Sequence, residues 1–238
     1  MDIILVPGFW LDASSWEEVA PVLEATGHRA RPLTLPGKES VGASRAGISL
    51  QDHIDAVVEV LDGLPGKVAL VGHSGGGAII HGAADARPDK VERAIYVDSG
   101  PLGEGGVIND ELPSVGDDVP LPSWEDFDDA DLVDLTDGLR QAFRARAVPE
   151  PRGVAYAKQR LHDQRRYSIP ATVIACEFPS AMIREWIAAG HPFVAELAKV
   201  RDVEYIDLPT GHWPQLTKPE PLAQAIVAAV DRTTVSPA

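Results

Sequence analysis

Residues 68–84 read VALVGHSGGGAIIHGAA, and this stretch decides the fold. A short apolar run leads into Gly72-His73-Ser74-Gly75-Gly76 and then directly into small apolar residues without proline. The pattern G-x-S-x-G is typical of a turn so tight that neighbouring side chains would clash, which raises the serine hydroxyl at its tip. A strand over 67–72 and a helix over 76–86 supply the required order, so we predict that Ser74 is a nucleophile.

Two other interpretations of this glycine-rich turn were weighed. Ser74 can instead cap the following helix, since serine is a favoured N-cap residue. A phosphate-binding loop requires a Lys-Ser/Thr pair after its last glycine, whereas Gly77 is followed by Ala78 and Ile79. The phosphate loop is therefore excluded, and the order of strand, turn and helix favours the nucleophile.

The composition is that of an ordinary globular chain. Of 238 residues, 45% are hydrophobic and 24% are charged, which predicts one main domain with a large core. The 36 acidic residues exceed the 21 basic ones and give a net charge of −15, which repels nucleic acid and anionic membranes. We expect a small-molecule substrate and no nucleic-acid or membrane partner, and the sequence carries no signal for the oligomeric state.

Cys176 is the only cysteine, so neither an intrachain disulfide nor a cysteine-based metal site can form. Met1 is followed by no basic segment or cleavage site, and no apolar run approaches the length of a membrane span. These features predict a reduced, cytoplasmic setting. No histidine and cysteine spacing suggests a metal site, and we expect no cofactor.

Short apolar runs alternate with helical patterns along most of the chain. Strands are expected at 3–6, 30–35, 67–72, 91–98, 171–176 and 203–208, and helices at 15–26, 50–61, 76–86 and 221–230. This alternation predicts an α/β fold in which a mostly parallel central sheet carries helices on both faces.

One segment, 101–168, breaks the alternation. It is rich in proline and acid, and helical stretches are expected near 137–147 and 153–162. We predict that it forms a helical lid on a core made of residues 1–100 and 169–238. Nine acids and no basic residue lie between Asp117 and Asp137, a pattern typical of a solvated helical face.

A serine nucleophile needs a histidine base, which a carboxylate usually holds in place. Most of the histidines lie in expected helices or their ends, or in a connector: His28, His53, His81, His162 and His191. His212 instead lies four residues beyond an expected strand, in a loop that Gly211 allows to be tight. Open α/β sheets place their sites in such loops, so His212 is the predicted base.

The order of these motifs, nucleophile first and Gly-His loop last, resembles the α/β-hydrolase family. The stretch LVPGFWLDASSW at 5–16 is similar to the family's His-Gly oxyanion segment, with Pro7 in place of the histidine. Because the chain starts directly with this segment, it resembles the small esterase and methylesterase branch. The resemblance implies that Ser74 is the nucleophile and His212 the general base.

The same resemblance assigns the oxyanion hole to the backbone N–H groups of Phe9 and Gly75. We expect Trp10 and Trp213, which follow the oxyanion segment and the histidine, to bind substrate. The aromatic residues Trp124, Phe127 and Phe143 either line the pocket or form the lid's own small core.

Two residues are candidates for the acid that orients His212. In this family the acid commonly follows the strand after the lid, where the loop ACEFPSAM offers only Glu177. Some members place it after the strand that follows the nucleophile helix, where AIYVDSGP offers Asp98. We favour Asp98, because its strand is expected beside the nucleophile's strand and a short side chain can reach across the sheet edge. The alternative for Asp98 is a turn residue before Gly100-Pro101.

The resemblance implies a serine hydrolase that cleaves a neutral ester, lactone or thioester through a Ser-His-Asp triad and an acyl-enzyme. A haloalkane dehalogenase would need an aspartate at position 74, and plant hydroxynitrile lyases carry a threonine at the position of Gly8 and a lysine at that of Trp213. Fold alone does not choose the reaction. A catalytically silent binding or scaffold protein stays open, as does a cofactor-free oxygenase or tailoring enzyme acting on an aromatic or polyketide substrate.

Overall fold

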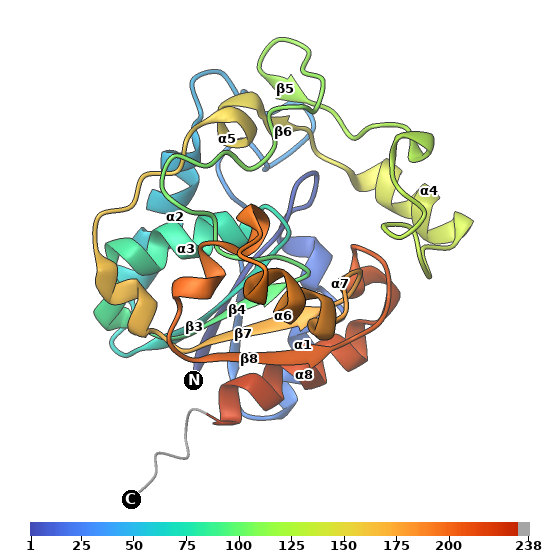
Figure 1. Cartoon of the computed structure of the whole chain (residues 1–238). Helices are drawn as coiled ribbons and strands as arrows, with labels where there is room; N and C mark the ends of the chain where they lie inside the picture. Colours follow the sequence, from blue (N-terminus) through green and yellow to red (C-terminus); the bar gives the residue numbers. More distant parts are fainter. Residues whose placement is uncertain (233–238) are drawn as a thin grey trace, which may run out of the picture.

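Six strands form the central sheet of the computed structural model, which describes residues 1–232 (Figure 1). These are β1 (Asp2–Val6), β2 (Arg29–Pro32), β3 (Val68–His73), β4 (Val91–Val97), β7 (Ala171–Ala175) and β8 (Val203–Asp207). All neighbouring pairs are parallel, in the order β2-β1-β3-β4-β7-β8. A parallel sheet brings the carboxyl ends of its strands to one edge, where α/β folds place their sites.

Helices cover both faces of this sheet, α2 and α3 on one face and α1 and α8 on the other. The α-helices of the described residues are α1 (Ala20–Ala25), α2 (Leu50–Gly63), α3 (Gly76–Ala86), α4 (Asp137–Arg146), α5 (Arg152–Tyr156), α6 (Ser180–Ala188), α7 (Pro214–Thr217) and α8 (Pro219–Asp231). Short 3-10 helices are η1 (Ala13–Trp16), η2 (Pro88–Lys90), η3 (Trp124–Asp126), η4 (Gln164–Ser168), η5 (Pro192–Val194) and η6 (Leu197–Lys199).

Alternating side chains of the strands divide the core into two layers. Ile3 and Leu5 of β1 pack with residues of α1 and α8, while Ile4 and Val6 pack on the opposite face with residues of α2 and α3. All four β1 side chains are fully buried, as strands covered on both faces must be. The predicted α/β fold, with a mostly parallel sheet between helices, is confirmed.

Two helical predictions differ from the structure, and helices α6 and α7 were not predicted. The region 15–26 divides into η1 and α1, because Pro21 fits the first turn of a new helix and not the interior of a longer one. The helix expected over 153–162 ends at Tyr156. Helix α6 has Ile183 as its one buried residue, so its sequence carries only a weak apolar stripe.

The segment 101–168, here called the cap segment, lies over the sheet at the top of Figure 1. It contains α4, α5 and two short antiparallel strands that were not predicted, β5 (Asp118–Val119) and β6 (Glu150–Pro151). A pair of two-residue strands is too short to show alternation of apolar and polar residues.

Two buried cations fasten the β2–α2 loop to the cap segment. The ammonium group of Lys38 donates to the Val148 carbonyl oxygen at 2.9 Å and pairs with Glu150 at 2.8 Å. The Nε atom of Arg45 donates to the Pro149 carbonyl oxygen at 2.9 Å. Both cations are almost fully buried, so these contacts hold the cap segment against the core.

Within residues 1–232, no helix has both the length and the apolar character that crossing a bilayer requires.

Candidate active site

Ser74 lies at the turn between β3 and α3, with a backbone φ of 50°. Few non-glycine residues adopt this left-handed conformation, and it marks local strain. The flanking glycines are required, since a Cβ at Gly72 would lie 2.5 Å from the Gly76 carbonyl oxygen. A Cβ at Gly76 would lie 2.8 Å from the carbonyl oxygens of Val6 and Pro7. The turn therefore presents the Ser74 hydroxyl as the sequence predicts.

His212 lies in the loop between β8 and α7, and its Nε2 atom is 2.7 Å from Ser74 Oγ. The structure therefore brings the two residues together across 138 positions of sequence. At this distance the imidazole can accept the hydroxyl proton.

A second histidine, His73, holds the backbone of His212. Its Nε2 atom donates to the His212 carbonyl oxygen at 2.6 Å, and its Nδ1 atom accepts from Gln215 Nε2 at 3.1 Å. Burial lowers the pKa of His73 to about 3, so the ring is neutral and carries its proton on Nε2. Sequence reasoning assigned no role to His73, although it is the variable residue before the serine in G-x-S-x-G.

Both candidate acids reach His212. The Nδ1 atom lies 2.6 Å from Asp98 Oδ2 and 2.9 Å from Glu177 Oε2. Asp98 follows β4, and its Oδ1 atom accepts the backbone N–H groups of Cys176 and Glu177 at 3.1 and 3.0 Å. These two bonds tie the end of β4 to the end of β7, which sets Glu177 beside Asp98.

The two carboxyl groups differ in their affinity for a proton. Burial raises the pKa of Asp98, but hydrogen bonding and attraction to His212 outweigh it and bring the value to about 2. Burial also raises the pKa of Glu177, and there the neighbouring Asp98 offsets the effect of His212, leaving a value of about 7. Burial lowers the pKa of His212, yet the hydrogen bonds to both acids outweigh burial and raise it to about 10. Because both acids hydrogen-bond to one imidazole, their titrations are coupled, and Glu177 holds a proton more readily than Asp98 does.

The loop that follows β1, which contains Gly8 and Phe9, lies against Ser74. A Cβ at Gly8 would lie 2.9 Å from Ser74 Cβ, and one at Gly75 would lie 2.8 Å from the Phe9 ring. No hydrogen-bond acceptor within the described chain binds the backbone N–H of Phe9 or Gly75. Both predicted oxyanion donors are thus close to the serine and have no partner among residues 1–232.

The two predicted substrate-binding tryptophans are not among the residues that line the cavity beside Ser74. Trp213 is 1% exposed and packs edge-on against His212, with a ring distance of 5.3 Å. Trp10 is also buried and donates to the Val119 carbonyl oxygen at 3.1 Å. Both belong to one aromatic cluster with cap residues Trp124, Phe127 and Phe143. The structure uses these rings to pack the cap segment on the core.

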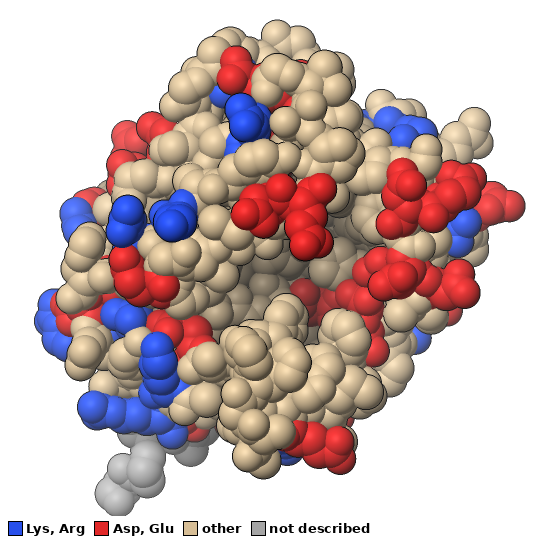
Figure 2. All heavy atoms as spheres, turned by 45° about the horizontal axis from the view of Figure 1, so that its top comes forward, with Lys and Arg blue, Asp and Glu red and all other residues tan. Residues whose placement is uncertain are grey.

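A cavity of about 440 Å³ opens beside Ser74, and its wall includes Asp98, Glu177 and His212. Most of the remaining wall is apolar and comes from the cap segment, α6 and η5. Examples are Leu102, Val107, Ile108, Phe178, Trp186 and Phe193. Figure 2 shows a hollow on the face beneath the cap, with uncharged residues inside it and Asp and Glu side chains along part of its rim.

The acids and His212 also have ligand atoms within 4.8 Å of one another, a spacing that a metal ion can use. In the described chain the same imidazole nitrogen is already hydrogen-bonded to both carboxyl groups.

Comparison with known proteins shows similarity of the chain to hydrolases. A profile described as the alpha/beta hydrolase family matches residues 3–225. A pyrethroid hydrolase from Sphingobium wenxiniae is 29% identical over 253 residues, covering 97% of this chain and 88% of that protein. Methylesterase 8 from Arabidopsis thaliana is 37% identical over 99 residues, covering 40% of this chain and 36% of the relative.

Solved structures share the fold. An extracellular alpha/beta-hydrolase from a Paenibacillus species superposes with a TM-score of 0.77 at 22% identity, covering 96% of this chain and 98% of that one. At this level of identity the likeness shows the fold alone.

Proposed function

We propose that Ser74, His212 and Asp98 form the catalytic triad of this chain. The chain belongs to the alpha/beta hydrolase family, and its esterase relatives indicate a carboxylic ester hydrolase-like enzyme. The observation that carries this proposal is one chain of contacts. Ser74 Oγ lies 2.7 Å from His212 Nε2, and His212 Nδ1 lies 2.6 Å from Asp98 Oδ2. Nucleophile, base and orienting acid are thus in series, as acyl transfer requires.

In the proposed reaction, Ser74 Oγ attacks the substrate carbonyl carbon while His212 Nε2 takes the hydroxyl proton. The negatively charged Asp98 stabilises the imidazolium that forms. His212 then returns the proton to the leaving alcohol or thiol, which leaves an acyl group on Ser74. A water molecule, deprotonated by the same imidazole, hydrolyses this acyl-enzyme and regenerates the serine.

The tetrahedral intermediate carries its negative charge on the former carbonyl oxygen. We assign the backbone N–H groups of Phe9 and Gly75 to this oxygen, because both lie beside Ser74 and have no acceptor in the described chain. Fixed donors of this kind contribute about 3 kcal/mol each to transition-state stabilisation.

Glu177 fits a supporting role beside Asp98. With a pKa of about 7, its carboxyl group carries a proton for much of the time near neutral pH, whereas Asp98 stays ionised. The ionised acid is the better acceptor for the His212 Nδ1–H group. We therefore keep Asp98 as the triad acid and assign Glu177 to the position next to it.

The cavity supports the proposed substrate class. Its largely apolar wall suits a neutral ester, lactone or thioester with an apolar body. Acidic side chains at the rim and the net charge of −15 disfavour anionic substrates. The relatives named pyrethroid hydrolase and methylesterase support the hydrolysis of an ester.

A fluorophosphonate probe and a set of p-nitrophenyl esters test the proposal. We expect covalent labelling of the wild-type protein, no labelling of Ser74→Ala, and a loss of hydrolysis on the order of 10³-fold or more in that variant. A folded protein that is neither labelled nor active would instead support a silent binding protein. Oxygen consumption with aromatic substrates in the absence of hydrolysis would support the oxygenase.

A further inference from the structure

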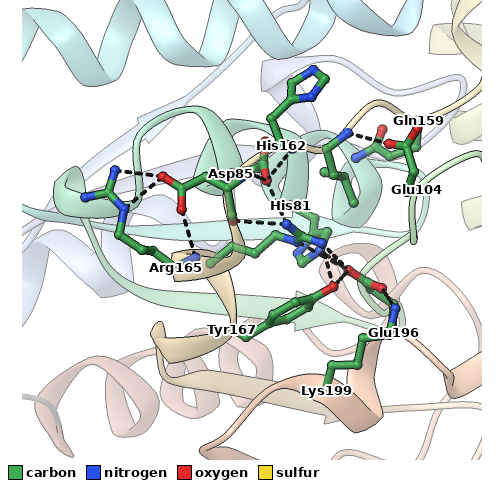
Figure 3. A network of polar contacts seen from close by, with 12 residues as sticks. His81, Asp85, Glu104, Gln159, His162, Arg165, Tyr167, Glu196 and Lys199 are labelled. Atoms are coloured by element: carbon green, nitrogen blue, oxygen red, sulfur yellow. Dashed lines mark hydrogen bonds and ion pairs between the residues drawn. The ribbon is translucent and has the colours of Figure 1, made fainter.

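A second buried carboxylate, Glu196, lines the same cavity as Ser74. Its side chain is 4% exposed and is surrounded by donors (Figure 3). The Oε1 atom accepts from His81 Nε2 at 3.2 Å, Arg166 Nη2 at 3.2 Å and the Tyr167 hydroxyl at 2.9 Å. The Oε2 atom accepts from Lys199 Nζ at 2.8 Å.

The two oxygens of Glu196 are not equally covered. Within residues 1–232, Lys199 is the one donor that reaches Oε2, and a carboxylate oxygen has room for two. Gly103, also in the cavity wall, faces this oxygen, because a Cβ there would lie 3.1 Å from Oε2. Glu196 and Gly103 both line the cavity, so we take the unfilled acceptor position of Oε2 to face it.

Helix α3 relates this carboxylate to the reacting centre. Ser74, at the start of the helix, and Ala78, one turn later, both line the cavity, and His81 in the next turn bonds to Glu196. Seven residues at 1.5 Å per residue place His81 roughly 10 Å along the axis from Ser74. The cavity therefore runs along α3 from the nucleophile toward the carboxylate.

The charges around Glu196 cancel. Arg166 pairs with both Asp85 and Glu196, and Lys199 pairs with Glu196. Burial lowers the pKa of His81 despite the nearby carboxylate, so the ring is neutral. A substrate cation at this site would therefore be buried without a counter-ion. A neutral hydroxyl needs no counter-ion.

We propose that Glu196 Oε2 accepts a hydrogen bond from a neutral hydroxyl group of the substrate, at the end of the cavity remote from Ser74. This inference rests on the proposed function for its orientation, since the ester group must lie at Ser74. A spacer of a phenyl ring and two carbons between the scissile carbonyl and the hydroxyl fits within the roughly 10 Å along α3. The ester thus carries a phenolic or alcoholic hydroxyl at its far end.

Binding to the Ser74→Ala variant tests this inference without requiring turnover. Calorimetry compares methyl 3-(4-hydroxyphenyl)propanoate with methyl 3-phenylpropanoate, which differ only in the hydroxyl. We expect the hydroxylated ester to bind about tenfold more tightly, because hydrogen bonds to an ionised acceptor are strong. The 2-hydroxyphenyl isomer, whose hydroxyl is misplaced, should lack this advantage. A second pair, the acetate esters of 3-(4-hydroxyphenyl)propanol and 3-phenylpropanol, presents the same groups from the alcohol side.

Two glycine substitutions in the same background provide a matched comparison. Gly103→Ala places a methyl group over Oε2 and should reduce the hydroxyl preference to about 1. Gly100→Ala adds a methyl to the same cavity wall where no atom lies within 4 Å, and it should retain the preference. Circular dichroism checks folding. If Gly103→Ala does not fold, Glu196→Asp, which keeps the charge but withdraws the carboxylate by one carbon, replaces it.

Equal binding of both members in both ester pairs overturns the inference, and so does a preference that survives Gly103→Ala or its replacement. Its failure is distinct from failure of the proposed function. A protein labelled at Ser74 that shows no hydroxyl preference loses only the role of Glu196. A protein that shows the preference but is not labelled keeps the Glu196 site and loses the hydrolase mechanism.

Discussion

His212 and His81 both contact carboxyl groups that line one cavity, yet their pKa values move in opposite directions. Burial lowers the pKa of each ring, but two hydrogen-bonded acids reverse the effect at His212 and raise its value to about 10. At His81 burial prevails, because the carboxylate of Glu196 is shared with Arg166 and Lys199. The same pair of residue types therefore forms a proton acceptor in one place and a neutral hydrogen-bond donor in the other.

The difference lies in the cations nearby. No arginine or lysine pairs with Asp98 or Glu177 in the described chain, so His212 alone compensates their charge. Arg166 and Lys199 already neutralise the charge of Glu196, so protonation of His81 would add an unpaired buried charge. A histidine beside a buried acid is thus a candidate base only where other cations do not already neutralise that acid.

The largest effect is expected when both acids of the His212 group are removed. Asp98→Asn should lower kcat for p-nitrophenyl acetate by about 10²–10³-fold, less than the roughly 10⁴-fold typical of a triad acid, because Glu177 still accepts from Nδ1. Glu177→Gln alone should cost less than about tenfold, and the double variant about 10⁴-fold. Steady-state kinetics on folded variants checks this series. A double variant no slower than Asp98→Asn would show that Glu177 contributes nothing to orienting the base.

A smaller effect is expected in the pH dependence. Only neutral His212 can accept the Ser74 proton, so kcat/KM should rise with pH through the pKa of that ring. Ionised Glu177 raises this pKa, and Glu177→Gln removes its charge. The acid limb of the kcat/KM profile should therefore move to lower pH by on the order of one unit. An unchanged limb, or a move to higher pH, would mean that the Glu177 charge does not act on the base.

The smallest effect on turnover is expected at His81. His81→Gln disturbs buried contacts to Glu196 and the Tyr96 hydroxyl, and it should lower the free energy of unfolding by about 1–3 kcal/mol. Turnover of p-nitrophenyl acetate, which is too short to reach Glu196, should change by less than about threefold. Urea denaturation and kcat are the two measurements. A loss of turnover near that of Asp98→Asn would contradict the contrast between the histidines.

The sequence predicted those parts of the molecule that short patterns determine. Apolar runs that alternate with helical patterns predicted the six strands of the sheet, and the fold class is confirmed. Gly72 and Gly76 indicated the turn at Ser74, because neighbouring backbone atoms lie so close to both residues that a side chain is excluded. His212 and Asp98 were chosen because they follow strands whose carboxyl ends meet at one sheet edge, and the structure brings them together there.

Other features depend on contacts between distant segments. The sequence favours Asp98 over Glu177, because the direction of the Glu177 side chain after β7 depends on two backbone hydrogen bonds to Asp98. The aromatic character of Trp213 suggested substrate contact, whereas packing against cap residues buries it. Glu196 lies between the short helices η5 and η6 and belongs to no motif, and its burial requires partners from α3 and η4.

The buried cations Lys38 and Arg45 constrain how a ligand can travel between solvent and Ser74. Lifting the cap segment as a rigid body would separate them from the carbonyl oxygens of Val148 and Pro149, and the buried ammonium group of Lys38 would also lose Glu150. Elsewhere in the cavity wall, the rings of Phe178 and Phe193 are 39% and 71% exposed. A ligand is therefore expected to enter past these two rings, with the cap segment in place.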